Sequence, residues 1–387
     1  QQTTMAISSS EARYIVESCL ADFRIDGRSR LEHRPYAIAN RSTQSRTTTG
    51  GAAPTLILSN GSSRVHLPGS STDVLCSVKA DLVHPSPKKP NEGVVELGVD
   101  LSLCGGGGSV RGVASSNGGQ QRRAQREEES QISSLLQRLV LPHAVDYETL
   151  AVWPGRYVWR LAVDVVVLRC DGCVLDASSV AVREALRNTR LPQVKAVMDG
   201  ADNDKGGNGN GGGGSSSRND LMVDGDFKSA APPVGAEDCP LVATVSVLTA
   251  PPSAIPENCL SKGGKKRQRH RSVSVVDART EEEACASSRV CVSVDPRGNV
   301  CGVHTLGGGS GASLQEGGQD ENGGVSSSSM PLAMLGDIVN SAAKACENLY
   351  IMLNLDGEGS DVGRRNEVSE DDGCGYGYLL KDRFLIQ

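Results

Sequence analysis

The sequence predicts a two-lobed α+β protein in which each lobe is a group of strands followed by a helix. The clearest observation is residues 157–192, where a strand with apolar residues at period two leads through an Asp-Gly turn into an amphipathic helix. A second group of strands starts at Leu241 and leads to a helix over residues 331–355. Residues 199–217, between the two groups, are mostly Gly, Ser, Asn and Asp, which favours a flexible linker between two lobes.

The first lobe is expected to begin with a helix, because Ser8 to Ser10 followed by Glu11 are typical of a helix start. The apolar face of this helix would consist of Tyr14, Ile15, Cys19, Leu20 and Phe23. A turn is expected at residues 24–29, and strands at 55–60, 63–67, 74–82 and 93–104. Apolar residues at positions 132, 135, 136 and 139 then predict a helix with one buried stripe.

The strand in residues 157–169 is apolar on both of its faces, which predicts a central strand covered on both sides. Asp176 is expected to be the N-cap of the helix that follows, and this helix ends near Arg190 and Pro192. Residues 194–198 predict a short strand. In the second lobe, strands are expected at 241–250, 272–276, 290–295 and 300–305.

These patterns divide the chain into five parts. They are an N-terminal helix and turn (1–30), a first domain (31–198, with an insert at 105–125), a flexible linker (199–236), a second domain (237–355, with inserts at 251–271 and 307–329) and a tail expected to be disordered (356–387). The true start could be Gln1 or Met5.

Composition limits the function classes. The net charge is −6, so any site for a polyanion must be a local surface or be shared with partner chains. The 12 cysteines are scattered and lie mostly in apolar segments, and no apolar run is long enough for a membrane span. These features predict a soluble chain with reduced thiols in the cytosol or nucleus.

Three local signals have simpler interpretations than a ligand site. Cys170 and Cys173 have the spacing of half a zinc site, but they flank an Asp-Gly turn and no second pair follows, so a structural turn is favoured. The glycine runs lack the features of a phosphate-binding loop, and the histidines show no pairing with a nucleophile. The basic run at 262–271 is either a nuclear localisation signal, an RNA-contacting loop or a solvated insertion.

The chain resembles the RNase PH-like proteins, specifically the non-catalytic ring subunits of the RNA exosome, and among these the type called exosome component seven. The matching segments occur in the family's order: RIDGRS (24–29), STDVLCSVKADLVHP (71–85), KPNEG (89–93), QISSLLQRL (131–139), WRLAVDVVVLRCDGCVLDASSVAVREALRNTRLP (159–192) and SVVDARTEEEACASSRVCVSVDPRGNV (274–300). The resemblance implies the RNase PH-like fold, which is ribosomal protein S5 domain 2-like, with a second smaller α/β lobe and Gly/Ser-rich insertions.

The resemblance also locates the phosphorolytic site and shows where this chain departs from it. Active members bind phosphate with a Gly-Thr-Arg loop, where Cys173, Val174 and Leu175 stand here. They also have two Asp residues where this chain has Glu283 and Arg289. Because leucine cannot hold an anion and arginine replaces one carboxylate, we expect a pseudo-enzyme with no catalytic residues, no cofactor and no resident metal. Glu283 could still ligate a metal.

For RNA, the resemblance points to the helix that contains residues 131–139. Arg138 matches one of the family's basic positions, and Arg123 and Arg126 lie just before this segment. The simpler interpretation is that these are solvated charges near Glu127.

We therefore expect a non-catalytic core ring subunit of the exosome that scaffolds the complex and guides RNA for 3′–5′ processing and degradation, including rRNA processing and mRNA turnover. Its partners would be other RNase PH-like subunits in a hetero-hexameric ring, cap RNA-binding subunits and RNA, in the nucleus, nucleolus and cytoplasm. The alternative is an active phosphate-dependent 3′–5′ exoribonuclease, alone or in a composite site. Such an enzyme would need another phosphate site, for example at Arg187 and Arg190.

Overall fold

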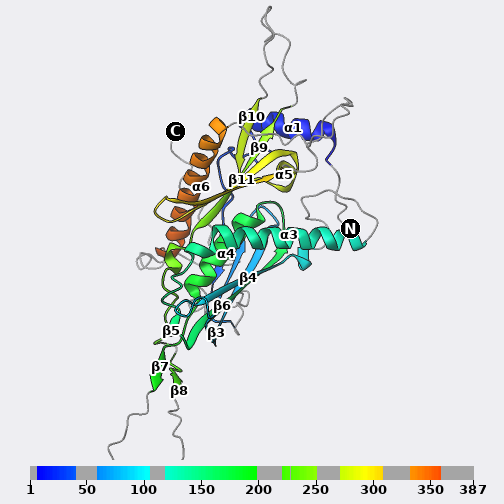
Figure 1. The fold of residues 1–387 in the computed structure, drawn as a ribbon. Helices are drawn as coiled ribbons and strands as arrows, with labels where there is room; N and C mark the ends of the chain where they lie inside the picture. Colours follow the sequence, from blue (N-terminus) through cyan, green and yellow to red (C-terminus); the bar gives the residue numbers. More distant parts are fainter. Residues whose placement is uncertain are drawn as a thin grey trace, which may run out of the picture.

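The computed structural model describes residues 7–40, 59–104, 118–197, 220–226, 228–250, 271–307 and 332–358. Two β-sheets lie one above the other in Figure 1, with helices packed between and beside them. Several sequence predictions lie outside the described residues. These are most of the strand at 55–60, the glycine-rich tracts, almost all of the basic run at 262–271 and the tail after residue 358.

The first sheet has six strands among the described residues. Their order is β1 (Ala37–Asn40), β2 (Gly61–His66), β3 (Asp73–Val83), β6 (Tyr157–Arg169) and β4 (Val94–Asp100), with β5 (Ala151–Trp153) paired to β6. β4 runs parallel to β6, and the other pairs are antiparallel. The strand predicted at 93–104 stops at Asp100, whose carboxylate accepts a hydrogen bond from the Ser102 N–H (2.7 Å) and turns the chain into a short 3-10 helix, η1 (Ser102–Cys104).

The prediction of a central strand at 157–169 is confirmed, but the prediction that both faces are covered is wrong. The face that includes Val163 and Val165 is buried against the core. On the other face the Asp164 side chain is 51% exposed and pairs with Lys79 across the sheet (3.6 Å). Charged side chains such as Asp164 and Lys79 therefore lie on the face that the single chain leaves partly exposed.

The second sheet has the order β10 (Ser272–Val276), β9 (Leu241–Thr249), β11 (Ala286–Val294) and β12 (Val300–Gly307), all antiparallel. All four strands predicted for this lobe are present. The sequence interpretation missed a short helix, α5 (Thr280–Cys285), and β11 begins at Ala286 rather than Val290.

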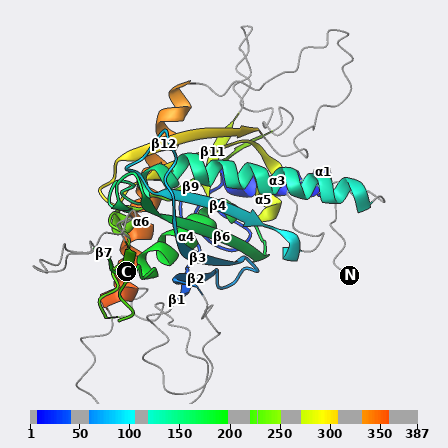
Figure 2. The ribbon, with the colours of Figure 1, turned by 60° about the horizontal axis from the view of Figure 1, so that its bottom comes forward.

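The described residues also form four longer helices: α1 (Ser9–Leu20), α3 (Gly118–Leu139), α4 (Val174–Asn188) and α6 (Leu332–Glu358). α4 contacts β2 and β3 on one side and β9 on the other, so it lies at the junction of the two lobes. α3 lies along the side of the molecule between β4 and β12 (Figure 2). α6 packs on β9 and β11.

The expected N-terminal helix is present with its predicted cap. The Ser8 hydroxyl accepts a hydrogen bond from the Glu11 N–H (3.2 Å). Ile15 and Cys19 are buried as expected, whereas Tyr14 and Phe23, which were assigned to the same apolar face, are exposed. The buried stripe of the helix consists of Ala12, Ile15, Val16 and Cys19, so it is shifted from the predicted face.

Two domain boundaries differ from the prediction. α3 starts at Gly118, inside the insert expected at 105–125, and pairs such as Arg123 with Glu127 (3.1 Å) support its first turns. The linker expected at 199–236 contains a strand, β8 (Asp220–Val223), which pairs with β7 (Val194–Val197). It also contains the 3-10 helix η3 (Ala236–Asp238), while η2 (Leu141–His143) follows α3.

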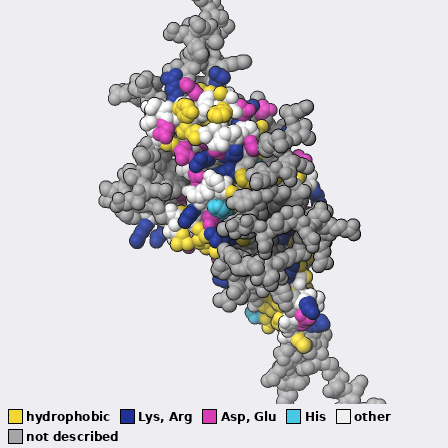
Figure 3. Space-filling view, turned by 180° about the vertical axis from the view of Figure 1, so that it is seen from behind, with side chains coloured by type: hydrophobic (Ala, Val, Ile, Leu, Met, Phe, Trp, Pro, Cys, Tyr) yellow, Lys and Arg dark blue, Asp and Glu magenta, His cyan; other side chains and the backbone are white. Residues whose placement is uncertain are grey.

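None of the cysteines in the described ranges forms a disulfide. Within those same ranges, no helix has the length and apolar character needed to cross a membrane. On the face shown in Figure 3, the described Lys and Arg side chains are interspersed with Asp and Glu side chains.

Candidate functional site

The candidate site lies where α4 begins, at the turn that follows β6. Gly172 and Cys173 both have positive φ (78° and 52°), which directs the chain sharply from the strand into the helix. This turn contacts the second lobe closely. A Cβ atom added at Gly172 would lie 2.4 Å from the Ala278 carbonyl oxygen, and the Cys173 thiol donates to that same oxygen (3.3 Å).

The structure brings together the two parts of the site that the resemblance placed far apart in the sequence. The backbone N–H of Cys173 donates a hydrogen bond to Glu283 Oε1 (2.9 Å), and Arg289 Nη1 lies 3.4 Å from Glu283 Oε2. Glu283 is buried, and burial raises the pKa of its carboxyl, an effect that the charge of Arg289 opposes. Leu175, the second residue of α4, is buried in the hydrophobic core.

This geometry has a chemical consequence. The first N–H groups of a helix lack intrahelical partners and attract anions. Here an internal carboxylate already accepts from the first of them, at Cys173, and a leucine side chain follows at position 175. Arg289 retains an Nε that is buried without a hydrogen-bond partner among the described residues. The first N–H of the helix start, that of Cys173, thus has its acceptor within the chain itself.

Asp176 does not cap α4, and that prediction is wrong. It lies inside the first turn, is fully buried, and accepts hydrogen bonds from the Thr244 N–H (2.9 Å) and hydroxyl (2.6 Å) on β9. Burial raises its pKa to about 7; the Thr244 hydrogen bonds oppose this shift, and the nearby carboxylates of Asp277 and Glu283 add to it. Asp176 therefore joins the central helix of one lobe to the central strand of the other.

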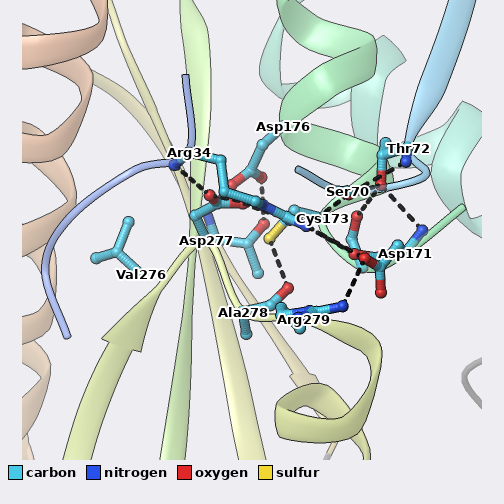
Figure 4. A network of polar contacts seen from close by, with 12 residues as sticks. Arg34, Ser70, Thr72, Asp171, Cys173, Asp176, Val276, Asp277, Ala278 and Arg279 are labelled. Carbon is cyan, nitrogen blue, oxygen red and sulfur yellow. Dashed lines mark hydrogen bonds and ion pairs between the residues drawn. The ribbon is translucent and has the colours of Figure 1, made fainter. Parts of the chain in front are cut away.

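Asp277 is the centre of the polar network in Figure 4. Its carboxylate accepts hydrogen bonds from the Arg34 guanidinium (2.6 Å to Oδ1) and backbone N–H (2.7 Å to Oδ2), and from Arg28 (2.8 Å). Burial opposes ionisation of Asp277, but the hydrogen bond and charge of Arg34 outweigh it and hold the pKa well below its usual range. Arg34 also donates to the Asp171 carbonyl oxygen (2.9 Å), which links this network to the turn before α4.

Arg24 forms a second buried contact between the N-terminal segment and the second lobe. Its guanidinium binds both carboxylate oxygens of Glu282 and donates to the carbonyl oxygens of Val276 (3.0 Å) and Asp277 (2.8 Å). The side chain is 0% exposed. The sequence predicted only a turn here, because the acidic partner of Arg24, Glu282, lies 258 residues away and no local pattern indicates it.

The three predicted RNA-contact residues lie on the exposed side of α3. Arg126 and Arg138 are exposed, and Arg123 is exposed and paired with Glu127. No hydrogen bond or ion pair between described residues connects any of the three to Glu283. The helix itself is held to the edge of β4 by Ser133 and Gln137, which both donate to the Leu97 carbonyl oxygen (3.2 and 3.0 Å).

In the part of the chain that the structure describes, no group of three His, Cys, Asp or Glu side chains is placed to hold an ion. Cys170 and Cys173 flank the turn, as the favoured structural interpretation expected.

Comparisons with known proteins give the class of this chain. The models of domain 1 and domain 2 of the 3′ exoribonuclease (RNase PH) family match residues 46–192 and 269–316. Together they match half of the chain in the family's order, and the chain therefore belongs to this family. This confirms the predicted RNase PH-like fold.

Two relatives and one solved structure illustrate the similarity. Exosome complex component RRP45A of Arabidopsis thaliana is 24% identical over 77% of this chain and 76% of that protein. Exosome complex component RRP45 of Saccharomyces cerevisiae is 23% identical over 78% of this chain and 81% of its own length. A chain of the Archaeoglobus fulgidus exosome with RNA bound to the active site has a TM-score of 0.55 at 19% identity, covering 88% of this chain and 97% of that one, which shows the shared fold.

Proposed function

We propose that this chain is a non-catalytic ring subunit of an RNA exosome. Two findings support the proposal: the relatives named as exosome complex components, which match more than three quarters of the chain, and the hydrogen bond from the Cys173 N–H to Glu283. That bond is the observation on which the proposed lack of catalytic activity rests. It leaves the helix start with an internal carboxylate where a phosphorolytic enzyme needs to bind orthophosphate.

In this role the chain scaffolds a hetero-hexameric ring with other RNase PH-like subunits and guides RNA toward 3′–5′ processing and degradation, with cap RNA-binding subunits as further partners. The exposed arginines of α3, Arg126 and Arg138, are its RNA-contact residues in this proposal. The component-seven subtype remains a prediction of the sequence, since the two exosome components compared above are named RRP45A and RRP45.

Assembly tests this role. The full-length chain is co-expressed with the other RNase PH-like chains of the same genome, and the purified complex is measured by native mass spectrometry. We expect a six-membered hetero-oligomer that contains one or more copies of this chain. A chain that remains monomeric or forms only homo-oligomers in the presence of those partners would contradict the ring assignment.

The second candidate, an active phosphorolytic exoribonuclease, requires another phosphate site. Arg187 was one sequence-based candidate for it, but its guanidinium binds Glu184 (3.0 Å) and Glu237 (2.6 Å). One observation favours a composite site shared with a neighbouring subunit. Arg138 and Arg126 are exposed, so they are free to contact RNA bound at that subunit's active site.

We also propose that the chain acts in the nucleus, nucleolus and cytoplasm. The basic run at 262–271, nearly all of it outside the described residues, is the sequence feature that supports nuclear entry. Fusion of this segment to a cytoplasmic fluorescent reporter tests it, with the Lys and Arg residues replaced by Gln as the control. Nuclear accumulation of the first fusion alone supports the proposal, and an unchanged distribution contradicts it.

A further inference from the structure

Two loops lie side by side at one end of the first sheet, away from the start of α4. One joins β3 to β4 and the other is the tight turn between β5 and β6, both at the lower end of the sheet in Figure 1. The Gly155 N–H donates to the Pro90 carbonyl oxygen (2.8 Å), and His84 Nδ1 lies 2.8 Å from the Arg156 carbonyl oxygen. These bonds hold the two loops as one surface, which we call the His84–Arg156 surface.

Two flat side chains on this surface are each supported by an aromatic ring. The His84 ring packs on Tyr157 with centroids 5.0 Å apart and planes inclined by 31°. The Arg156 guanidinium lies over the Trp153 ring, 4.8 Å from its centroid. His84 and Arg156 are exposed, whereas Trp153 and Tyr157 are half-buried beneath them. Supported imidazole and guanidinium planes are the groups on which unpaired nucleobases stack.

The surface also has free positive charge. Lys88 and Lys89 are exposed on the first loop, and Lys88 has no ion-pair partner among the described residues. Lys89 is partly neutralised by Glu92 (2.6 Å). A lysine ammonium beside two side-chain planes suits a single-stranded nucleic acid, because its phosphates can pair with the ammonium while its bases stack on the planes.

We propose that the His84–Arg156 surface binds single-stranded RNA, with bases stacked on His84 and Arg156 and a phosphate beside Lys88. This inference rests on the proposed role in handling RNA, and it assigns a surface distinct from both the start of α4 and the arginines of α3. An acidic protein segment is the competing ligand, but it would use the charges without the stacked planes.

The two tryptophans of the chain provide a local signal for the test. Trp153 is half-buried under Arg156, while Trp159 is only 8% exposed. The purified full-length chain is titrated with a twelve-nucleotide oligoadenylate RNA while tryptophan fluorescence and the anisotropy of labelled RNA are followed. We expect fluorescence quenching, and binding weakened about 5- to 100-fold by Arg156→Ala or His84→Ala. Arg297→Ala removes another exposed arginine, one outside this surface, and we expect it to leave binding unchanged.

Two further variants separate stacking from charge. Arg156→Lys keeps the positive charge but removes the planar group, and we expect it to weaken binding nearly as much as Arg156→Ala. Lys88→Ala should reduce the slope of log affinity against log salt by about 0.7. Circular dichroism confirms that each variant folds.

Several outcomes would overturn the inference. They are no quenching by RNA, full affinity in Arg156→Lys, or equal affinity for a polyglutamate peptide, which would indicate an acidic protein partner. The measurement uses the isolated chain, so it succeeds or fails independently of ring assembly. A chain that binds RNA here but enters no ring would contradict the proposed function alone.

Discussion

The carboxylate of Glu283 accepts a hydrogen bond from the backbone N–H of Cys173 at 2.9 Å, across the junction of the two lobes. This contact gives the start of α4 an acceptor from its own chain and places Arg289 beside the same carboxylate. It is therefore both a structural link and a physical reason why orthophosphate has no vacant amide at this position.

The first prediction concerns this link. Glu283→Ala leaves the Cys173 N–H and the Arg289 guanidinium without an acceptor in a buried environment, and we expect a loss of about 2–3 kcal/mol in the free energy of unfolding. Glu283→Gln retains an acceptor oxygen and should cost less than half as much. Urea unfolding at neutral pH measures both, and equal losses would show that the hydrogen bond contributes little.

The second prediction concerns Arg24 and Glu282. Arg24→Ala leaves the buried Glu282 carboxylate without its ion-pair partner, so we expect a loss of about 3–5 kcal/mol in the free energy of unfolding. Arg13→Ala breaks an exposed pair with Glu17 and serves as the control, with an expected loss below about 1 kcal/mol. Similar losses for the two variants would contradict a structural role for the buried pair.

The third prediction compares two glycines with almost the same φ. Gly155 (φ 77°) has open space around its Cα, whereas a Cβ at Gly172 (φ 78°) would meet Ala278 and Arg279 of the second lobe. Gly155→Ala should cost about 1–2 kcal/mol from backbone strain alone. Gly172→Ala should cost a further 1–3 kcal/mol, roughly, from the steric overlap. Thermal and urea unfolding measure the difference, and equal costs would mean that the turn and the second lobe are not in tight contact.

The fourth prediction is a pH dependence caused by Asp176. Its pKa is about 7 in the folded protein, and 3.8 is the ordinary value expected in the unfolded chain. Between these pH values the folded state binds more protons, so this group makes the free energy of unfolding fall as the pH rises from about 4 to about 7, by at most about 1.4 kcal/mol per pH unit. Asp176→Asn removes the titration while keeping partners for Thr244.

Other titratable groups change the pH dependence of the free energy of unfolding in different directions. The unchanged protein must therefore be compared with Asp176→Asn. Burial lowers the pKa of His33, and stability from that group is lost as the pH falls through its ordinary range. The lowered pKa of Asp277 adds stability that is lost only below about pH 4. Urea unfolding of both proteins between pH 4.5 and 7.5 isolates the contribution of Asp176. If the free energy of unfolding depends on pH in the same way in both proteins, the raised pKa of Asp176 is contradicted.

Local patterns in the sequence predicted the elements that carry the site, but not the contacts between them. β6 and α4 were predicted because their apolar periods of two and of three to four are visible within a single segment. The bonds that Thr244 donates to Asp176 and that Arg34 donates to Asp277 join residues separated by 68 and 243 positions, respectively. Such contacts leave no period in the sequence. The N-cap assignment of Asp176 failed for the same reason, because its partner lies on another lobe.

The central claim is tested most directly by phosphorolysis. The purified full-length chain is incubated with 3′-labelled single-stranded RNA, orthophosphate and Mg²⁺, and release of nucleoside diphosphates is followed. Because Glu283 already accepts from the Cys173 N–H and Leu175 offers no group for an anion, we expect no release by the chain alone. A ring reconstituted with this chain and its partners should still capture RNA. Release of nucleoside diphosphates by the isolated chain, abolished by Glu283→Gln, would contradict the account and require a phosphate site elsewhere.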